Sequence, residues 1–147
     1  MEPFTENDAL LLRMRSLFAS VDVPGLQFQI RELSHDGGTV TLEFQVSPAL
    51  ANQFGFVQGG IVTTMLDVCI GMAGAIKSGG LLAMPLAEMK TTFVRPTQPG
   101  RLVGKGETLR LGKTFAFIEA SLFSESGTLL ARASGTASPV PFPDATH

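Results

Sequence analysis

Cysteine and histidine are scarce in this chain of 147 residues, which contains one cysteine and two histidines. The single Cys69 excludes an intramolecular disulfide. One cysteine and two histidines are too few ligands for a zinc site. Cys69 stands among apolar residues, where a thiol is usually inert, and no motif places a histidine to activate it. His35 falls in a predicted turn and His147 is the last residue, so both are expected to be solvated. These absences predict a protein without a metal, from a reducing compartment such as the cytoplasm.

An excess of charge of either sign is also missing. The chain has 11 Lys and Arg against 13 Asp and Glu, a formal net charge of -2, so we expect no broad basic surface for nucleic acid or an anionic membrane. Residues 1–6 lack the basic and apolar regions of a secretory signal. The apolar run at residues 59–76 approaches the length of a membrane span, but its interior glycines, its threonines and Asp67 argue against one.

The length of the chain is typical of one domain with a single core, which we assign to residues 1–138. Residues 139–147 are predicted to be a flexible Pro-rich tail. Thr5 and Asp8 have the spacing of a capping box, and apolar residues follow at helical spacing. We therefore expect an N-terminal helix over residues 5–21.

A second helix and six strands complete the expected fold. The helix, at residues 59–76, has no clean polar face and is expected to be buried nearly all round. Alternating apolar residues predict strands at residues 26–30, 40–46, 81–94, 101–111, 114–123 and 128–138. Because strands joined by tight turns favour an antiparallel sheet, the fold class is α+β.

Asp67 is the only charged residue of the predicted central helix. Burial of an ionised carboxylate without a partner is unfavourable, so a buried Asp67 needs a raised pKa or a functional role. Gly71 and Gly74 continue its stripe along the helix and project no side chain, which predicts a groove for a ligand or another backbone. The alternative is a structural aspartate that is hydrogen-bonded to Thr63 or Thr64.

The loop at residues 52–60 leads directly into this helix. The first N–H groups of a helix have no intrahelical partner and the dipole is positive there, so Gly59 and Gly60 can receive a carbonyl oxygen that gains charge. Asp67 follows Gly59 by about two helical turns and lies on the same side. The alternatives are a tight junction without a ligand, and an Asn52 that only satisfies its own loop backbone.

This loop and helix resemble the hotdog-fold acyl-CoA thioesterases of the phenylacetyl-CoA (PaaI-like) type. Their pattern is Asn, a Gly three residues later, His-Gly-Gly, and an acidic residue nine positions after the His. The matching residues here are Asn52, Gly55, Gln58, Gly59, Gly60 and Asp67. Residues 91–100 and 111–117 are similar to two later motifs of the family. The resemblance covers residues 38–137 and implies an antiparallel sheet wrapped around a long central helix.

The resemblance implies hydrolysis of a medium-chain or aryl acyl-CoA to free acid and CoA, with no cofactor beyond the coenzyme A of the substrate. Asp67 would act as general base or nucleophile, and the residues do not decide between the two. Asn52 and Gln58 would position the reactants, and Gly59 with Gly60 would stabilise the oxyanion. The residues expected to contact substrate are Phe54, Phe56, Met72, Met84, Thr91, Thr92, Arg95 and Lys113.

Gln58 is a departure, because the family usually has His at this position. An amide can donate a hydrogen bond to a carbonyl oxygen but cannot exchange a proton near neutral pH. Proton transfer would therefore fall to Asp67 alone. A hydroxyl that some relatives carry is also missing, and Thr91 or Thr92 can replace it only if its side chain faces inward.

The sequence leaves other functions open. One is a non-catalytic domain that binds or senses acyl-CoA, and another is a hotdog hydratase or dehydratase, which normally requires the missing His. A Ser-His-Asp triad is disfavoured because the sequence has no Gly-x-Ser-x-Gly pattern. The family usually forms a homodimer or a dimer of dimers with each site built from two subunits, and we expect the same here.

Overall fold

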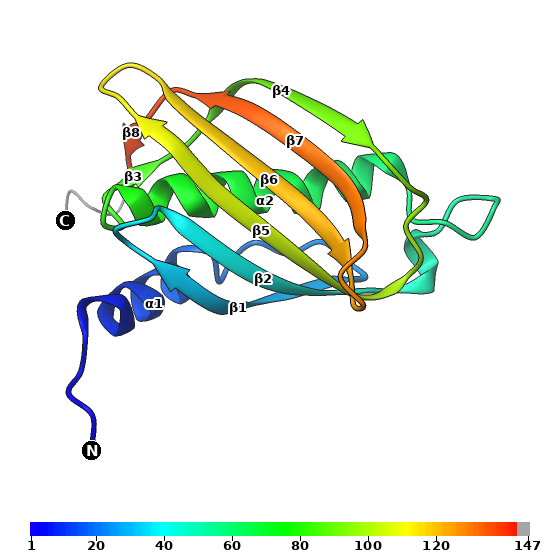
Figure 1. Cartoon of the computed structure of the whole chain (residues 1–147), viewed down its shortest axis with the longest axis horizontal. Coiled ribbons are helices and arrows are strands. Elements are labelled where there is room, and N and C mark those ends of the chain that lie inside the picture. The colour runs from blue at the N-terminus through cyan, green and yellow to red at the C-terminus, as the bar shows by residue number, and fades with distance from the viewer. Residues whose placement is uncertain (144–147) are drawn as a thin grey trace.

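The computed structural model of the chain describes residues 1–143, which form an antiparallel sheet wrapped around a long helix (Figure 1). The helices are α1 (Glu6–Leu17), α2 (Gly59–Lys77) and the short η1 (Pro48–Leu50). The strands are β1 (Leu26–Ser34), β2 (Thr39–Val46), β3 (Leu82–Ala83), β4 (Leu86–Phe93), β5 (Gly100–Leu111), β6 (Ala116–Ser124), β7 (Leu129–Ala137) and β8 (Val140–Pro141). The main sheet has the order β1-β2-β5-β6-β7-β4. This confirms the predicted α+β hotdog arrangement.

The central helix packs closely against the middle of the sheet because glycines stand at the contact. A Cβ atom at Gly74 of α2 would lie 2.5 Å from Cγ of Met84 and 2.7 Å from Cδ1 of Ile118. On β5, a Cβ at Gly104 would lie 2.6 Å from Sγ of Cys69. The predicted groove at Gly74 is therefore wrong, since core side chains fill that space. Cys69 is fully buried, and burial raises the pKa of its thiol.

Gly106 of β5 makes the closest of these contacts, because a Cβ there would collide with the backbone carbonyl of Cys69. We expect Gly106→Ala to lower the free energy of unfolding by about 2–3 kcal/mol. A Cβ at Gly71 meets nothing within 4 Å, so Gly71→Ala serves as the control and should raise stability by about 0.5–1 kcal/mol. Urea denaturation measures both, and an equal loss in the two variants would disprove the packing role of Gly106.

The N-terminal helix begins as predicted and ends earlier. The Thr5 hydroxyl accepts a hydrogen bond from the Asp8 N–H at 3.1 Å, and the Asp8 carboxylate accepts one from the Thr5 N–H at 2.8 Å. The helix was expected to reach residue 21 but ends at Leu17. The chain then has to cross to the start of β1, so Val21 lies 41% exposed on the connecting segment. We call residues 18–25 the strap.

Two differences concern the region of β3. The strand predicted at residues 81–94 is divided into β3 and β4, because Pro85 has no N–H for a sheet ladder. β3 pairs instead with β8, so Val140 and Pro141 are attached rather than part of a free tail. Residues 144–147 of the predicted tail lie outside the described residues.

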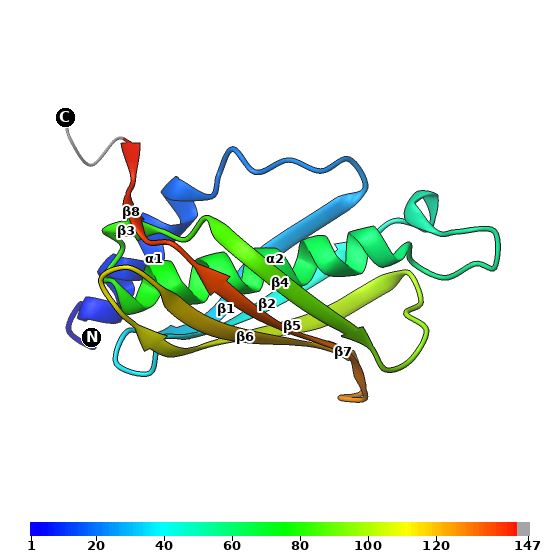
Figure 2. The same cartoon turned by 90° about the horizontal axis from the view of Figure 1, so that it is seen from above.

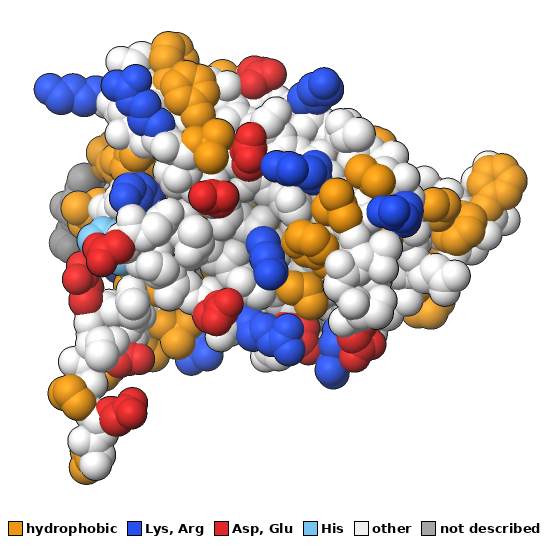
Figure 3. Space-filling view, in the orientation of Figure 1, with side chains coloured by type: hydrophobic (Ala, Val, Ile, Leu, Met, Phe, Trp, Pro, Cys, Tyr) orange, Lys and Arg blue, Asp and Glu red, His pale blue; other side chains and the backbone are white. Residues whose placement is uncertain are grey.

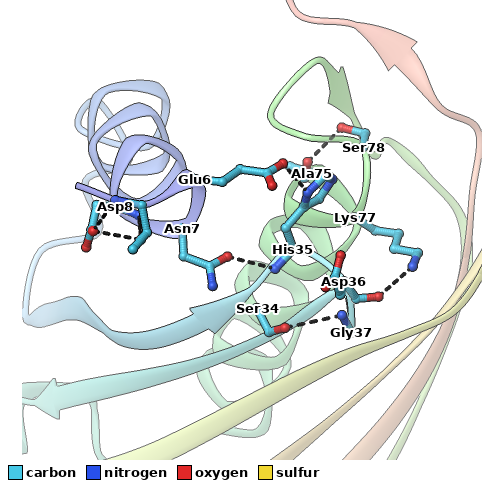
Figure 4. A network of polar contacts seen from close by, with 11 residues as sticks. Glu6, Asn7, Asp8, Ser34, His35, Asp36, Gly37, Ala75, Lys77 and Ser78 are labelled. Carbon is cyan, nitrogen blue, oxygen red and sulfur yellow. Dashed lines mark hydrogen bonds and ion pairs between the residues drawn. The ribbon is translucent and has the colours of Figure 1, made fainter. Parts of the chain in front are cut away.

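A polar network attaches α1 to the hairpin between β1 and β2 (Figure 4). Nδ1 of His35 lies 2.7 Å from Oε1 of Glu6, and the His35 backbone N–H donates to Oδ1 of Asn7 at 3.2 Å. Lys77, at the end of α2, donates to the carbonyl of Asp36 at 2.7 Å. His35 thus lies in the predicted turn, but it is half-buried and held against α1, so the expectation that it is solvated is wrong.

The long apolar helix is the core of the fold. Among the helices of residues 1–143, only α2 is long and apolar enough to cross a membrane, and the sheet buries most of it. Figure 2 shows that α2 has the curved sheet on one side and the strap on the other. On the outer face of the sheet, positive and negative side chains lie side by side (Figure 3), and Arg132 pairs there with Glu119 at 3.1 Å.

Candidate functional site

The loop before α2 projects beyond the sheet and is held by Asn52 (Figure 1). Oδ1 of Asn52 accepts hydrogen bonds from the N–H groups of Phe54 at 2.9 Å and Phe56 at 3.2 Å. Gly55 adopts a φ of 84°, which glycine tolerates readily, and its N–H donates to the Asn52 carbonyl at 3.0 Å. The carbonyl end of the Asn52 side chain thus shapes the loop. Its NH2 group makes no hydrogen bond within residues 1–143, so it can donate to a ligand.

The end of this loop is fixed to the body of the domain, which sets the position of the helix start. The Val57 N–H donates to the carbonyl of Thr97 at 2.8 Å, and the Gln58 N–H donates to that of Leu50 at 3.1 Å. Thr97 is buried. The helix entrance is therefore held by backbone bonds on both sides.

Gln58 is the N-cap of α2, and its side chain makes no capping hydrogen bond. Its backbone carbonyl accepts from the N–H groups of Ile61 at 2.9 Å and Val62 at 3.1 Å. The N–H groups of Gly59 and Gly60 have no helical partner, as at any helix start. The Gln58 amide makes no hydrogen bond within residues 1–143. Together with it, the two N–H groups form a set of donors at the positive end of the helix, where an oxyanion is stabilised.

The space around these donors is open. Gln58, Gly59 and Gly60 are all exposed. A Cβ at Gly60 would meet nothing within 4 Å, whereas one at Gly59 would lie 3.4 Å from the ring of Phe93. Phe93 of β4 therefore forms a wall beside the helix entrance. It was not predicted as a site residue, although it lies two residues after Thr91, on the same face of the strand.

Asp67 lies on the face of α2 that the sheet leaves uncovered, and its side chain is exposed. The expectation of a deeply buried carboxylate is wrong, because only the opposite face of the helix packs on the sheet. The pKa of Asp67 is nevertheless raised, because the surrounding protein removes part of its water. The proposed structural hydrogen bond is absent from the described part of the chain, and the Thr64 hydroxyl donates instead to the Gly60 carbonyl at 2.9 Å.

β4 contributes one threonine to the same side of the sheet as α2. Thr91 pairs with Ala133, a buried residue, and is half-buried. Thr92 pairs with Arg132 and lies on the outer face with Lys90. Of the two hydroxyls, that of Thr91 is the one that faces inward. Beyond β4 the described sheet has no further strand, so β4 is an open edge with unpaired backbone groups.

The other predicted substrate contacts are spread over the molecule. Phe54 is 74% exposed at the loop, and Phe56 is half-buried beside it. Arg95 donates from Nη1 to the carbonyl of Leu129 at 2.7 Å and thereby ties the chain after β4 to β7. Lys113 lies in the turn between β5 and β6, at the opposite end of the sheet from the start of α2 (Figure 1).

The two methionines predicted to contact substrate differ in their surroundings. Met84 fills the space beside Gly74 and belongs to the core. Met72 is also fully buried but lines a cavity under the strap. The structure thus brings together the Asn52 loop, the start of α2 and Phe93. Asp67 lies further along the same helix, and Met84, Thr92 and Lys113 lie elsewhere. Residues 1–143 hold no group of three His, Cys, Asp or Glu side chains placed to bind a metal ion.

Comparison with known proteins agrees with this geometry. The sequence profile of the thioesterase superfamily matches residues 54–131. A protein of Saccharolobus solfataricus that is described as an esterase is 23% identical over 123 residues, or 84% of this chain and 87% of that protein.

Solved structures give the same result. A phenylacetic acid degradation-related protein of Ralstonia eutropha, described as a thioesterase, is 27% identical with a TM-score of 0.73, covering 86% of this chain and 98% of that one. The E. coli PaaI protein, from the phenylacetic acid degradation operon, is 14% identical with a TM-score of 0.81, covering 92% and 96%, and is similar in fold alone. These similarities confirm the resemblance inferred from the loop and helix motif.

Proposed function

This chain belongs to the thioesterase superfamily and is a thioester hydrolase, and from that premise we propose that it hydrolyses a medium-chain or aryl acyl-CoA to the free acid and CoA. One observation carries the proposal. The N–H donors at the start of α2 and the Asp67 carboxylate, whose pKa is raised, have no hydrogen-bond partner within residues 1–143 and lie on the uncovered side of one helix. Acyl transfer requires both kinds of group, one for the oxygen that gains charge and one for proton transfer or attack.

In the proposed reaction the thioester carbonyl oxygen lies against the N–H groups of Gly59 and Gly60, and the Gln58 amide donates to the same oxygen. Asp67 takes a proton from water as the water oxygen bonds to the carbonyl carbon, or its carboxylate attacks that carbon first and water then hydrolyses the anhydride. On the first route the C–S bond then breaks, and CoA leaves as the thiol with the proton that Asp67 took. On the second route the C–S bond breaks as the anhydride forms, and the CoA thiolate takes the proton that water loses when it hydrolyses the anhydride. Gln58 takes no part in proton transfer.

We further propose that each site combines two copies of the chain. Gly59 and Asp67 are eight residues apart on α2, about 12 Å along the helix axis. A donor has to lie about 3 Å from the oxyanion and a base about 3 Å from the proton that it takes, so one thioester cannot reach both groups of one helix. The open edge of β4 gives a second copy a place to pair. Donors from one subunit would then face Asp67 of the other in a homodimer, alone or as half of a dimer of dimers.

We propose that the reaction uses no metal or redox cofactor and that the protein acts in the cytoplasm. The proposed hydrolysis is tested by a CoA-release assay with the wild type and Asp67→Asn over a panel of acyl-CoA thioesters, with binding of the same thioesters measured by calorimetry. We expect the wild type to release CoA fastest from medium-chain or aryl substrates. If the wild type binds acyl-CoA but releases no more CoA than Asp67→Asn, the chain is an acyl-CoA-binding protein and the proposal fails.

A further inference from the structure

A cavity of about 330 Å³ lies under the strap, between the end of α1 and β1. Its apolar walls come from α1, the strap, β1 and α2 and include Met14, Phe18, Leu26, Phe28, Ile30 and Met72. Exposed polar side chains, among them Arg15 and Gln27, also line it. The volume is near the lower end of the range of about 300–1,000 Å³ for small-ligand pockets. An apolar group of moderate size fits this space better than a nucleotide does.

The cavity lies beside the stretch of α2 that carries Asp67. Met72 follows Asp67 by five residues, about 7.5 Å along the helix axis. Gly71 stands between them without a side chain, and a Cβ there would meet nothing within 4 Å. Val68, one turn before Met72, is half-buried and apolar. Met72 is about 140° around the helix from Asp67, so an acyl group would cross Gly71 and Val68 to reach the cavity.

From this arrangement we propose that the cavity receives the acyl group of the substrate in the subunit that supplies Asp67. The inference rests on the proposed acyl-CoA hydrolysis and adds the place where the acyl group is selected. Flexible thioether side chains at Met14 and Met72 adapt to linear and aromatic groups alike. The walls also set an upper limit on length, so the enzyme prefers medium-chain or aryl acyl groups to long ones.

The α1 wall of the cavity is held in place, which helps to define the upper limit on the length of the acyl group. Arg13 donates from Nε to the carbonyl of Gly80 at 2.7 Å, which ties the middle of α1 to the segment after α2. The contacts of Glu6 and Asn7 with His35 tie its start to the β1–β2 hairpin (Figure 4). The α1 side of the cavity is therefore fixed to the rest of the fold.

Chain-length selectivity tests the inference. We expect Ile30→Phe, which narrows the cavity, to lower kcat/KM for octanoyl-CoA about tenfold and to leave butanoyl-CoA within about twofold. Phe18→Ala enlarges the cavity and should move the preferred chain to a longer one. Phe117→Ala makes the same change at an exposed site on β6 and should leave the profile unaltered. A uniform loss over all chain lengths in Ile30→Phe would overturn the inference while leaving the proposed hydrolysis intact.

A binding measurement separates the inference from the catalytic proposal. With 13C-methyl methionine labels, the uncleavable thioether octyl-CoA should shift the NMR signals of Met14 and Met72, while those of Met65 and Met84 move little. Ile30→Phe should weaken these shifts. Shifts of Met14 and Met72 in a protein that releases no CoA would support the cavity and refute hydrolysis. An active protein whose Met14 and Met72 signals do not respond would refute the cavity.

Discussion

Replacement of Asp67 by Asn is expected to lower kcat about 1,000-fold while the affinity for acyl-CoA changes little. The amide has nearly the shape of the carboxylate, and Asp67 makes no hydrogen bond or ion pair in the described residues that the change would break. What is lost is the ability to accept a proton or to attack the thioester. No other ionisable group of the motif can compensate, because Gln58 replaces the usual His. Stopped-time CoA release and calorimetry measure the two quantities separately.

The pH profile adds a second readout for the same residue. Partial burial raises the pKa of Asp67, and only the ionised form acts as base or nucleophile. The activity of the wild type should therefore fall as the pH decreases through that raised pKa, which lies above the usual range for Asp. A loss of less than tenfold in Asp67→Asn, with the acid limb of the profile unchanged, would show that Asp67 is not the catalytic group.

Gly59→Pro is expected to lower kcat by about 100–1,000-fold, the effect of removing one oxyanion donor. Gly59 is the first residue of α2, where proline is well tolerated because its missing N–H has no helical partner. Gln58 has φ -53° and ψ 138°, a conformation that suits the residue before proline. The substitution therefore deletes one N–H group and preserves the helix.

Gly59→Ala is the matched control. It adds the same Cβ, which would lie 3.4 Å from the Phe93 ring, and it keeps the N–H donor. We expect it to retain activity within about tenfold of the wild type. Circular dichroism checks that both variants fold. If Gly59→Ala loses as much activity as Gly59→Pro, the effect comes from crowding by Phe93, and the assignment of the oxyanion donor is wrong.

Local patterns in the sequence predicted most elements of the fold. The capping box at Thr5, the apolar run of α2 and the alternation of the strands depend on neighbours a few residues away, so they can be read from the chain. The end of α1 could not be predicted in this way, because it depends on where β1 has to begin. The split at Pro85 likewise depends on pairing with Val140 and Pro141, which lie far along the sequence.

In the candidate site, too, the local features could be predicted from the sequence and the features that depend on distant segments could not. The spacing of Asn52, Gln58, Gly59 and Asp67 identified the loop and helix, because that motif is local. The exposure of Asp67 was missed, since an apolar helix sequence does not reveal which face the sheet leaves uncovered. Spacing also could not distinguish Gly74, which is packed against Met84, from Gly71, which is open. The contact of Phe93 with Gly59 depends on the position of β4 over the helix entrance.

The central claim is that donors of one subunit act with Asp67 of the other, and a mixed dimer tests it most directly. Asp67→Asn and Gly59→Pro chains with different affinity tags are co-expressed, and the heterodimer is purified through both tags. In the proposed arrangement, one of its two sites combines the intact Gly59 of the Asp67→Asn chain with the intact Asp67 of the Gly59→Pro chain. The heterodimer should therefore show about half of the wild-type activity, although each parent is nearly inactive. A heterodimer that is no more active than its parents would contradict the claim and place both groups of each site in one chain.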